Sequence, residues 1–383
     1  MRVSLLTPLD IKYSVSATEK LIYEYASYLK NSDVDVELLV PTKVFDNHNK
    51  LRKDYKDIEL QYSIINKKSI NFIFFKNYYY SMFYYFNLPT NRIVFLPYSP
   101  YYYITNILTK PTTTKYIIGA WNMHLYAGEH SQNHRVLSNL LDGVIRTLFK
   151  LRGTAFLDTL YFLVENSQQK YYIIKNLHIR AQKIFYIPLF IDTNEFSVTK
   201  NNSKKLRVLH IGGIEKNAML MAKIIHNAIE KNIMEDFEFW FIGKSMPDEL
   251  ITLSKSYKNI KNYGMVTDKT KRILLSKADV LAVTSVEGFG LKILEAFASG
   301  LEVICLDNPA CTDISATGLK IHTIDRNMPE NYLIILKKLF YKKQNRAFSL
   351  KTRMAKRKLL KKNFDKAVVT PKFFEMLTKI NST

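Results

Sequence analysis

The amino-acid sequence predicts an α/β protein with two doubly wound domains, and three observations lead to this fold class. The chain opens with a strand, a helix and a strand at residues 3–7, 17–29 and 34–40. The same order of elements restarts near residue 207 and recurs through residues 278–310. The length of 383 residues is enough for two domains with separate cores. Such repeats predict parallel sheets, and two halves of this kind would place a shared ligand in a cleft between them.

The first half is predicted from its short apolar runs. Further strands are expected at residues 58–64, 70–75, 93–96, 116–120, 160–164 and 184–188, and a helix at 137–151. Asn166 and Ser167 can cap another helix. The aromatic cluster at residues 78–86 is predicted to be a buried helix. The alternative is a surface at a membrane interface, with the nearby lysines on anionic lipid.

The second half repeats the strand and helix pattern. Strands are expected at residues 207–211, 237–242, 259–265, 280–283, 303–306 and 319–324, and helices at 219–229, 250–257, 269–276, 291–298 and 331–340. The basic segment 351–362 is predicted to be an exposed helix face that could also touch phosphates. We expect domains at residues 1–190 and 206–364, with residues 191–205 as a polar linker. A last amphipathic helix, within residues 365–383, should pack back on the first domain.

Composition limits the partners and the compartment. The net charge of +22 suggests an anionic partner, which could be a membrane surface, nucleic acid or a phosphorylated substrate. A lysine bias of the whole genome is the alternative. Two cysteines cannot make a disulfide framework, which favours a reducing compartment. No apolar run reaches the ~20 residues of a spanning helix. The apolar run at the amino terminus is too short for a signal peptide. We expect a cytoplasmic protein, with peripheral attachment to the inner membrane face as an option.

The stretch at residues 278–310 has the clearest chemical character. A strand ends in polar residues, a turn contains Glu287, Gly288, Phe289 and Gly290, and a helix follows that contains Glu295. The turn therefore lies where a strand's carboxyl end meets a helix's amino end. Ligands of open α/β sheets bind at such places, and exposed N–H groups favour phosphate there.

The spacing of Glu287 and Glu295 within EGFGLKILEAFASG closely resembles a known signature. It is the signature of retaining nucleotide-sugar glycosyltransferases of the group 1 or family-four type, whose GT-B fold has two Rossmann-like domains facing a cleft. The segments GGIEKN, NIKNYGMVTD, IPLFIDTNEF and IIGAWNMH resemble the same family. The resemblance implies transfer of a hexose from a UDP- or GDP-sugar with retention, in glycan biosynthesis.

The resemblance also implies roles for particular residues. His124 would face the donor sugar, with His130 and His134 as alternatives, and Glu287 would bond that sugar. Lys216 would contact the diphosphate and Glu295 the ribose hydroxyls. The whole set of donor-binding residues would be Gly212, Gly213, Lys216, Lys244, Met265, Gly288, Phe289, Gly290, Leu291 and Glu295.

Two departures from the family pattern affect parts of this site. The family has an arginine where this chain has Gly213, so one cation for the diphosphate is missing, and Lys244 or Lys292 could replace it. The family's glycine-rich loop after the first strand is absent, because residues 9–16 contain no glycine. Asp10, Lys12 or Ser14 could line that loop instead.

No Asp-x-Asp motif or His/Cys cluster argues for a metal, so the expected reaction uses none. The leaving phosphate would take the acceptor proton as attack occurs on the same face of the sugar. The favoured acceptor is a lipid-linked or cell-surface glycan. The alternatives are a glycosyltransferase acting on DNA or protein, and a catalytically silent scaffold that only binds a partner.

Overall fold

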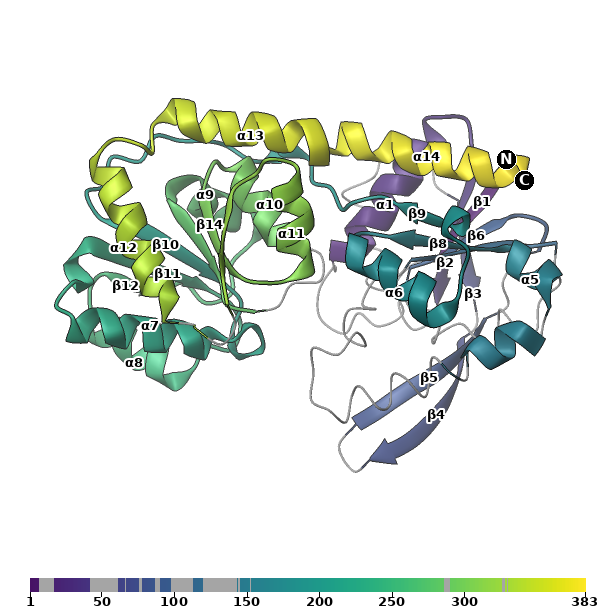
Figure 1. Cartoon of the computed structure of the whole chain (residues 1–383), viewed down its shortest axis with the longest axis horizontal. Coiled ribbons are helices and arrows are strands. Elements are labelled where there is room, and N and C mark those ends of the chain that lie inside the picture. The colour runs from purple at the N-terminus through teal and green to yellow at the C-terminus, as the bar shows by residue number, and fades with distance from the viewer. Residues whose placement is uncertain are drawn as a thin grey trace. The chain divides into compact units, whose positions relative to one another are not determined.

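The structure is a computed structural model. It describes residues 1–6, 17–41, 61–65, 67–75, 78–86, 90–97, 113–119, 143, 145–151, 153–285, 290–325, 328 and 330–383. The chain forms two compact units (Figure 1). One unit combines Met1–Pro188 with Val369–Thr383, and the other is Leu189–Val368. In the part of the chain that is described, no helix is long and apolar enough to cross a membrane.

The first unit is built on a seven-stranded sheet whose paired strands are all parallel. The order is β3 (Gln61–Ile65), β2 (Asp35–Pro41), β1 (Arg2–Leu6), β6 (Ile93–Leu96), β7 (Lys115–Gly119), β8 (Leu160–Val164) and β9 (Ile184–Tyr186). The helices α1 (Ala17–Lys30), α5 (Thr154–Asp158) and α6 (Ser167–Leu177) accompany it. The predicted cap is confirmed, because the Asn166 side chain accepts a hydrogen bond from the Gln169 N–H at 2.8 Å.

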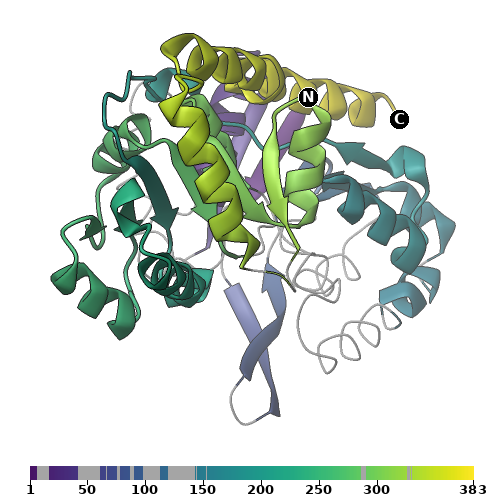
Figure 2. The same cartoon turned by 60° about the vertical axis from the view of Figure 1, so that its left-hand side comes forward.

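A separate antiparallel ribbon replaces the helix predicted at residues 78–86. Strands β4 (Lys67–Phe75) and β5 (Tyr78–Phe86) pair only with each other (Figure 2). The helix prediction is therefore wrong. Tyrosine and phenylalanine favour strands, and a short continuous apolar run does not distinguish a strand from a buried helix.

The last helix, α14 (Lys366–Ser382), completes the core of the first unit. The Phe373 ring stacks on Tyr25 with ring centroids 4.0 Å apart, and it meets Phe95 edge-on at 5.6 Å. The Lys115 ammonium donates a hydrogen bond to the Ile380 carbonyl at 2.7 Å. Helix α14 therefore packs on the first sheet, although it lies more than 250 residues after Lys115 in the sequence.

The second unit is built on a six-stranded sheet in which all pairs are again parallel. The order is β12 (Ile260–Asn262), β11 (Phe237–Ile242), β10 (Leu206–Ile211), β13 (Val280–Val283), β14 (Glu302–Leu306) and β15 (Ile321–Ile324). These strands confirm the parallel sheet expected from the repeated strand–helix–strand pattern. The carboxyl ends of β12, β11, β10 and β13 lie side by side at one edge.

Seven longer helices surround this second sheet. They are α7 (Ala218–Glu230), α8 (Asp248–Ser256), α9 (Asp268–Lys277), α10 (Leu291–Ala298), α11 (Pro309–Ala316), α12 (Asn331–Gln344) and α13 (Leu350–Phe364). Side chains of α7, α8 and α12 share one buried core with the strands. Helix α13 packs against α10. Only α11 was not expected from the sequence.

Residues 191–205, predicted to be a linker, lie within the second unit. The Thr193 and Phe196 side chains are buried there. The Arg357 guanidinium from α13 donates hydrogen bonds to the carbonyls of both residues. The polar composition of this segment therefore reflects its many hydrogen bonds to α13 and to the sheet.

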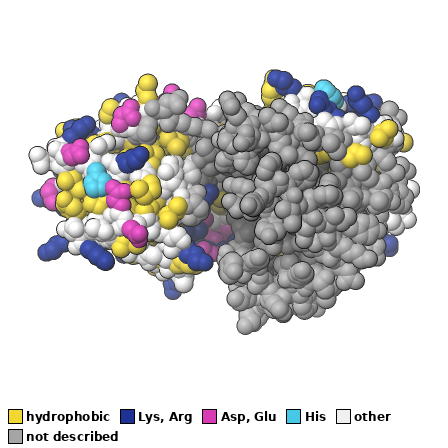
Figure 3. Space-filling model, turned by 90° about the horizontal axis from the view of Figure 1, so that it is seen from below, with side chains coloured by type: hydrophobic (Ala, Val, Ile, Leu, Met, Phe, Trp, Pro, Cys, Tyr) yellow, Lys and Arg dark blue, Asp and Glu magenta, His cyan; other side chains and the backbone are white. Residues whose placement is uncertain are grey.

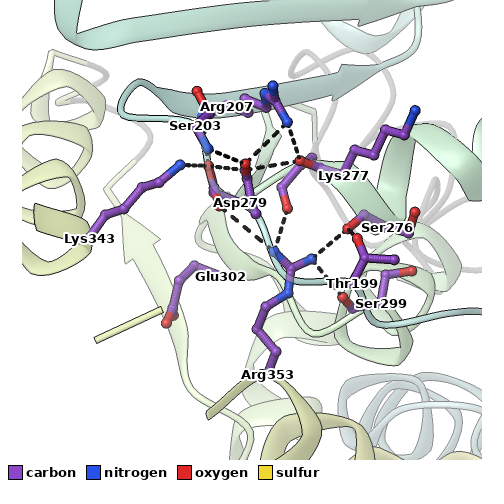
Figure 4. A network of polar contacts seen from close by, with 12 residues as sticks. Thr199, Ser203, Arg207, Ser276, Lys277, Asp279, Ser299, Glu302, Lys343 and Arg353 are labelled. Atoms are coloured by element: carbon purple, nitrogen blue, oxygen red, sulfur yellow. Dashed lines mark hydrogen bonds and ion pairs between the residues drawn. The ribbon is translucent and has the colours of Figure 1, made fainter. Parts of the chain in front are cut away.

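A buried charged network holds the amino edge of the second sheet (Figure 4). Asp279, which precedes β13, is fully buried, and its carboxylate lies 2.6 Å from the Lys343 ammonium and 3.8 Å from the Arg353 guanidinium. It also accepts the Arg207 N–H at 2.9 Å. Arg353 in turn donates to three carbonyls, those of Ser276, Ala278 and Ser299, at 2.9–3.0 Å. The network ties α12, α13 and β13 together at the edge opposite the glycine-bearing turns.

Candidate functional site

The predicted donor-binding residues that the structure describes gather at the carboxyl edge of the second sheet. Four neighbouring parallel strands end there, and the segment that follows each strand carries one part of the predicted set. Gly212, Gly213 and Lys216 follow β10, Lys244 follows β11, Met265 follows β12, and Gly290 and Leu291 follow β13. His124, Glu287, Gly288 and Phe289 lie outside the described residues.

The glycines after β10 and β11 allow two loops to meet backbone to backbone. Gly212 has φ 125°, a conformation that favours glycine. A Cβ atom on Gly243 would lie 2.7 Å from the Gly212 carbonyl carbon, so no larger residue fits there without movement. The Gly243 N–H donates to the Gly264 carbonyl at 3.0 Å, which extends the contact to the segment after β12. The loops after β10, β11 and β12 are therefore in contact with one another along the carboxyl edge of the sheet.

The Lys216 segment is fixed to the end of β13. Lys216 closes a short 3-10 turn, Ile214–Lys216, and its carbonyl accepts the Thr284 hydroxyl at 2.9 Å. Asn217 has left-handed backbone angles, and its side-chain amide donates to the Thr284 carbonyl at 3.2 Å. The turn that carries Lys216 is thus held beside the strand that leads to Glu287.

Gly290 shapes the start of α10. It is buried, has φ 72°, and precedes the first helical residue, Leu291. A Cβ atom there would lie 3.2 Å from the Ile314 side chain and 3.3 Å from that of Ala310, so α11 packs directly against this turn. The first N–H groups of a helix have no partner within the helix, and they carry its positive dipole end. An anionic group would be stabilised at this position.

Glu295 is held by a lysine that sequence reasoning missed. The Glu295 carboxylate lies 2.8 Å from the ammonium of Lys271 in α9, and both side chains are mostly buried. Burial alone would lower the pKa of Lys271, but the Glu295 carboxylate outweighs it and holds that pKa above its ordinary value. Lys271 therefore stays charged and orients Glu295. Lys271 is one of several lysines in α9, so the sequence alone does not identify it as the partner of Glu295.

Lys292 places a second cation at this edge. Its ammonium lies 3.4 Å from the Ile211 carbonyl and 3.3 Å from the Ser285 hydroxyl, at the ends of β10 and β13. These are the two central strands of the sheet. Lys244 follows β11, one strand further out, and Met265 is 71% exposed beyond β12. Among the described residues, no three His, Cys, Asp or Glu side chains form a group that could hold a metal ion.

Comparison with known proteins identifies the unit that contains this site. Residues 205–338 match the model of the family described as glycosyl transferases group 1. The second unit therefore contains a group 1 glycosyltransferase domain. No curated protein matches it.

Solved structures agree in fold with the whole chain. A glycosyltransferase from Rickettsia africae has a TM-score of 0.69 at 15% identity, with 99% of this chain and 98% of the other covered. Anabaena Alr3699/HepE in complex with UDP-glucose has a TM-score of 0.66 at 11% identity, covering 99% and 100%. WaaG, a glycosyltransferase involved in lipopolysaccharide biosynthesis, has a TM-score of 0.57 at 11% identity, covering 98% and 99%. The GT-B fold expected from the sequence is thereby confirmed.

Proposed function

We propose that this glycosyltransferase moves a hexose from a nucleoside-diphosphate sugar to an acceptor hydroxyl, with retention of the anomeric configuration. The observation that carries the proposal is the Glu295–Lys271 pair, at 2.8 Å, on the helix that starts at Gly290. A charged lysine bonds the Glu295 carboxylate and fixes its position. A carboxylate held in this way can accept hydrogen bonds from the two ribose hydroxyls of the donor.

The diphosphate would be stabilised by fixed dipoles and two cations. The N–H groups at the start of α10 and the Lys216 segment converge on the carboxyl ends of β10 and β13. The Lys292 ammonium lies at the same two strand ends, which favours it over Lys244 as the replacement for the missing arginine. Preorganised positive charge of this kind stabilises a leaving diphosphate without a metal ion. His124 and Glu287 keep the roles that the family resemblance implies, next to the donor sugar.

The acceptor we propose is a lipid-linked or cell-surface glycan at the cytoplasmic face of a membrane. Two facts support this choice. The net charge of +22 suits an anionic surface. WaaG, which shares the fold, is involved in lipopolysaccharide biosynthesis. The donor would be a UDP- or GDP-sugar, and the complex of Alr3699/HepE with UDP-glucose makes UDP-glucose the first donor to test.

A thermal-shift panel of UDP, GDP, ADP and their sugars tests the donor site. A ligand that binds only the folded protein raises its apparent stability by RT ln(1 + [L]/Kd), so the correct nucleotide stands out. Glu295→Gln should abolish most of this shift. Glu230→Gln removes an exposed acid at the end of α7 in the same unit and should leave it unchanged. Equal shifts in both variants would refute the proposed ribose contact.

The reaction itself is tested by donor hydrolysis and by product stereochemistry. The protein should hydrolyse UDP-glucose or GDP-mannose slowly without acceptor, and Glu295→Gln should remove this activity. An inverted anomeric product in the NMR spectrum would refute retention. Nucleotide binding without any hydrolysis or transfer would instead support the catalytically silent scaffold, which the loss of an arginine at Gly213 favours.

A further inference from the structure

Helix α13 has an outer face that the donor site does not use. Its members are two apolar residues and four lysines, all exposed: Leu350, Lys351, Met354, Lys358, Lys361 and Lys362. At 3.6 residues per turn these six positions fall within an arc of about 120° around the helix. We call them the basic face. Leu350 is 45% exposed and Met354 48%, although both are apolar.

The other cations of α13 point inward, and each has a structural partner. Arg353 bonds three carbonyls near the amino edge of the sheet, and Arg357 bonds the carbonyls of Thr193 and Phe196. Lys356 lies 2.6 Å from the Glu302 carboxylate. Among the described residues, no acidic side chain forms an ion pair with the four lysines of the basic face. Their charge is therefore available to an external partner.

The positive charge around this face is not balanced locally. Residues 331–364, which include α12 and α13, contain twelve Lys or Arg residues and no Asp or Glu. The described surface of the second unit that is seen in Figure 3 differs, because basic and acidic side chains are interspersed there. Figure 1 shows α13 as a layer outside α10. The basic face therefore presents a field of one sign on the outside of the unit.

We propose that the basic face of α13 docks the second unit on a membrane surface that contains anionic lipids. The positive charge of lysines is attracted to the anionic headgroups of such a surface. Exposed leucine and methionine side chains can enter the boundary between headgroups and acyl chains. A nucleic-acid site needs the cations but gains nothing from Leu350 and Met354. The apolar members of the face thus favour a lipid surface over a phosphate backbone.

The inference deepens the proposed function, because a lipid-linked acceptor is met only at a membrane. The basic face lies on α13, whereas the donor site is built from the carboxyl-edge loops and α10. Docking and donor chemistry therefore depend on different residues, and each can fail without the other.

Co-sedimentation of the full chain with lipid vesicles tests the docking. We expect binding to vesicles of phosphatidylcholine with phosphatidylglycerol, and little binding to phosphatidylcholine alone. The binding should weaken as salt rises, because exposed charges are screened. Met354→Ser should weaken binding without changing its dependence on salt. Absence of binding to the anionic vesicles would overturn the proposal.

A matched pair of charge variants makes the test specific to this face. One variant carries Lys351→Gln, Lys358→Gln, Lys361→Gln and Lys362→Gln. The control carries the same change at four lysines exposed elsewhere in the second unit: Lys200, Lys204, Lys231 and Lys255. Both remove four positive charges. We expect at least about tenfold weaker vesicle binding for the first and a change within about twofold for the control.

The remaining outcomes separate docking from chemistry. Equal losses in the two variants would overturn the proposal, because net charge alone would then govern binding. A gel shift with DNA that is lost in the first variant, together with no vesicle binding by the unaltered chain, would assign the face to nucleic acid instead. Donor hydrolysis should persist in the first variant, and vesicle binding should persist in Glu295→Gln. Unchanged melting temperatures would show that both lysine variants are folded.

Discussion

The amino edge of the second sheet buries its charges in pairs, whereas the carboxyl edge carries glycines and partly exposed cations. At the amino edge, Asp279 is fully buried between Lys343 and Arg353. At the carboxyl edge, Met265 is 71% exposed and Lys216 and Lys292 are only partly buried. The two edges of the same six-stranded sheet thus have different chemical environments.

The difference indicates that the amino edge mainly stabilises the unit, whereas the carboxyl edge mainly serves function. A buried ion pair whose members are well bonded is costly to break, so substitutions at the amino edge should unfold the unit. Charged side chains at the carboxyl edge are less buried, so replacing them should change ligand binding more than stability. Trp240 in β11 can report unfolding of this unit by fluorescence once Trp121, the only other tryptophan, is replaced by Phe.

The largest effect is expected for Asp279→Ala. The substitution leaves Lys343 and Arg353 buried without their carboxylate, which costs about 3–5 kcal/mol in the free energy of unfolding. Urea titration followed by Trp240 fluorescence measures this loss. Asp279→Asn keeps the hydrogen-bond acceptor and should cost less. A loss below about 1 kcal/mol for Asp279→Ala would show that the network contributes little.

The next effect is a dependence of stability on pH through Glu302. Burial alone would raise the pKa of this carboxyl, but the hydrogen bond with His322 and the Lys356 ammonium outweigh burial and hold the pKa at about 2, below its ordinary 4.5. A lowered folded pKa stabilises the protein above pH 4.5, and the contribution is lost as pH falls from there toward 2. Glu302→Gln should therefore cost about 3 kcal/mol near neutral pH.

The pH series itself provides the control for Glu302. The difference in unfolding free energy between the unaltered chain and Glu302→Gln should fall to less than half of its neutral value by about pH 3. A difference that stays constant from pH 7 down to about pH 3 would contradict the assigned pKa.

A smaller effect is expected from a pair of glycine substitutions at the carboxyl edge. Gly243→Ala places a Cβ 2.7 Å from the Gly212 backbone and should cost about 2–3 kcal/mol through overpacking. Gly264→Ala meets nothing within 4 Å, and only its φ of 63° opposes the change, so about 1 kcal/mol is expected. Urea titrations of the two variants check the order. Equal losses of unfolding free energy in the two variants would show that the contact between the loops does not contribute to stability.

The smallest effect on stability, with a clear effect on binding, is expected for Lys271→Met. The Lys271 and Glu295 side chains, although mostly buried, keep 22% and 18% of their surface in contact with solvent, so the unfolding free energy should change by less than about 1 kcal/mol. Nucleotide binding should weaken about tenfold, because Glu295 loses the partner that orients it. Lys277→Met removes an exposed lysine at the end of the same helix and should change neither quantity. Tighter nucleotide binding by Lys271→Met in a calorimetric titration would mean that Lys271 competes with the ribose.

The sequence predicted the parallel sheets because they depend on local periodicity. Apolar runs such as Val280–Val283 identify strands without knowledge of their neighbours. The ribbon at β5 was missed because a run of tyrosine and phenylalanine fits a buried helix as well as a strand. The turn at Gly290 was predicted because its glycine spacing is a local signal.

The remaining parts depend on partners far along the chain. Residues 191–205 look like a linker by composition, but Arg357 and Asp365 bond Thr193 from more than 160 residues away. Lys271 reaches Glu295 only because α9 and α10 flank the same strand, β13, at its two ends. Contacts of this kind follow from packing, which a single sequence does not display.

The path of the chain has a consequence for its synthesis on the ribosome. The second unit is one continuous segment, Leu189–Val368, so all its strands have been made before α14 emerges. The first unit lacks Phe373 and Ile380, which are fully buried in its core, until α14 is translated. A chain that stops early would therefore expose the apolar surface that α14 covers. Cellular quality control would recognise such a product as incomplete, although its second unit could already be folded.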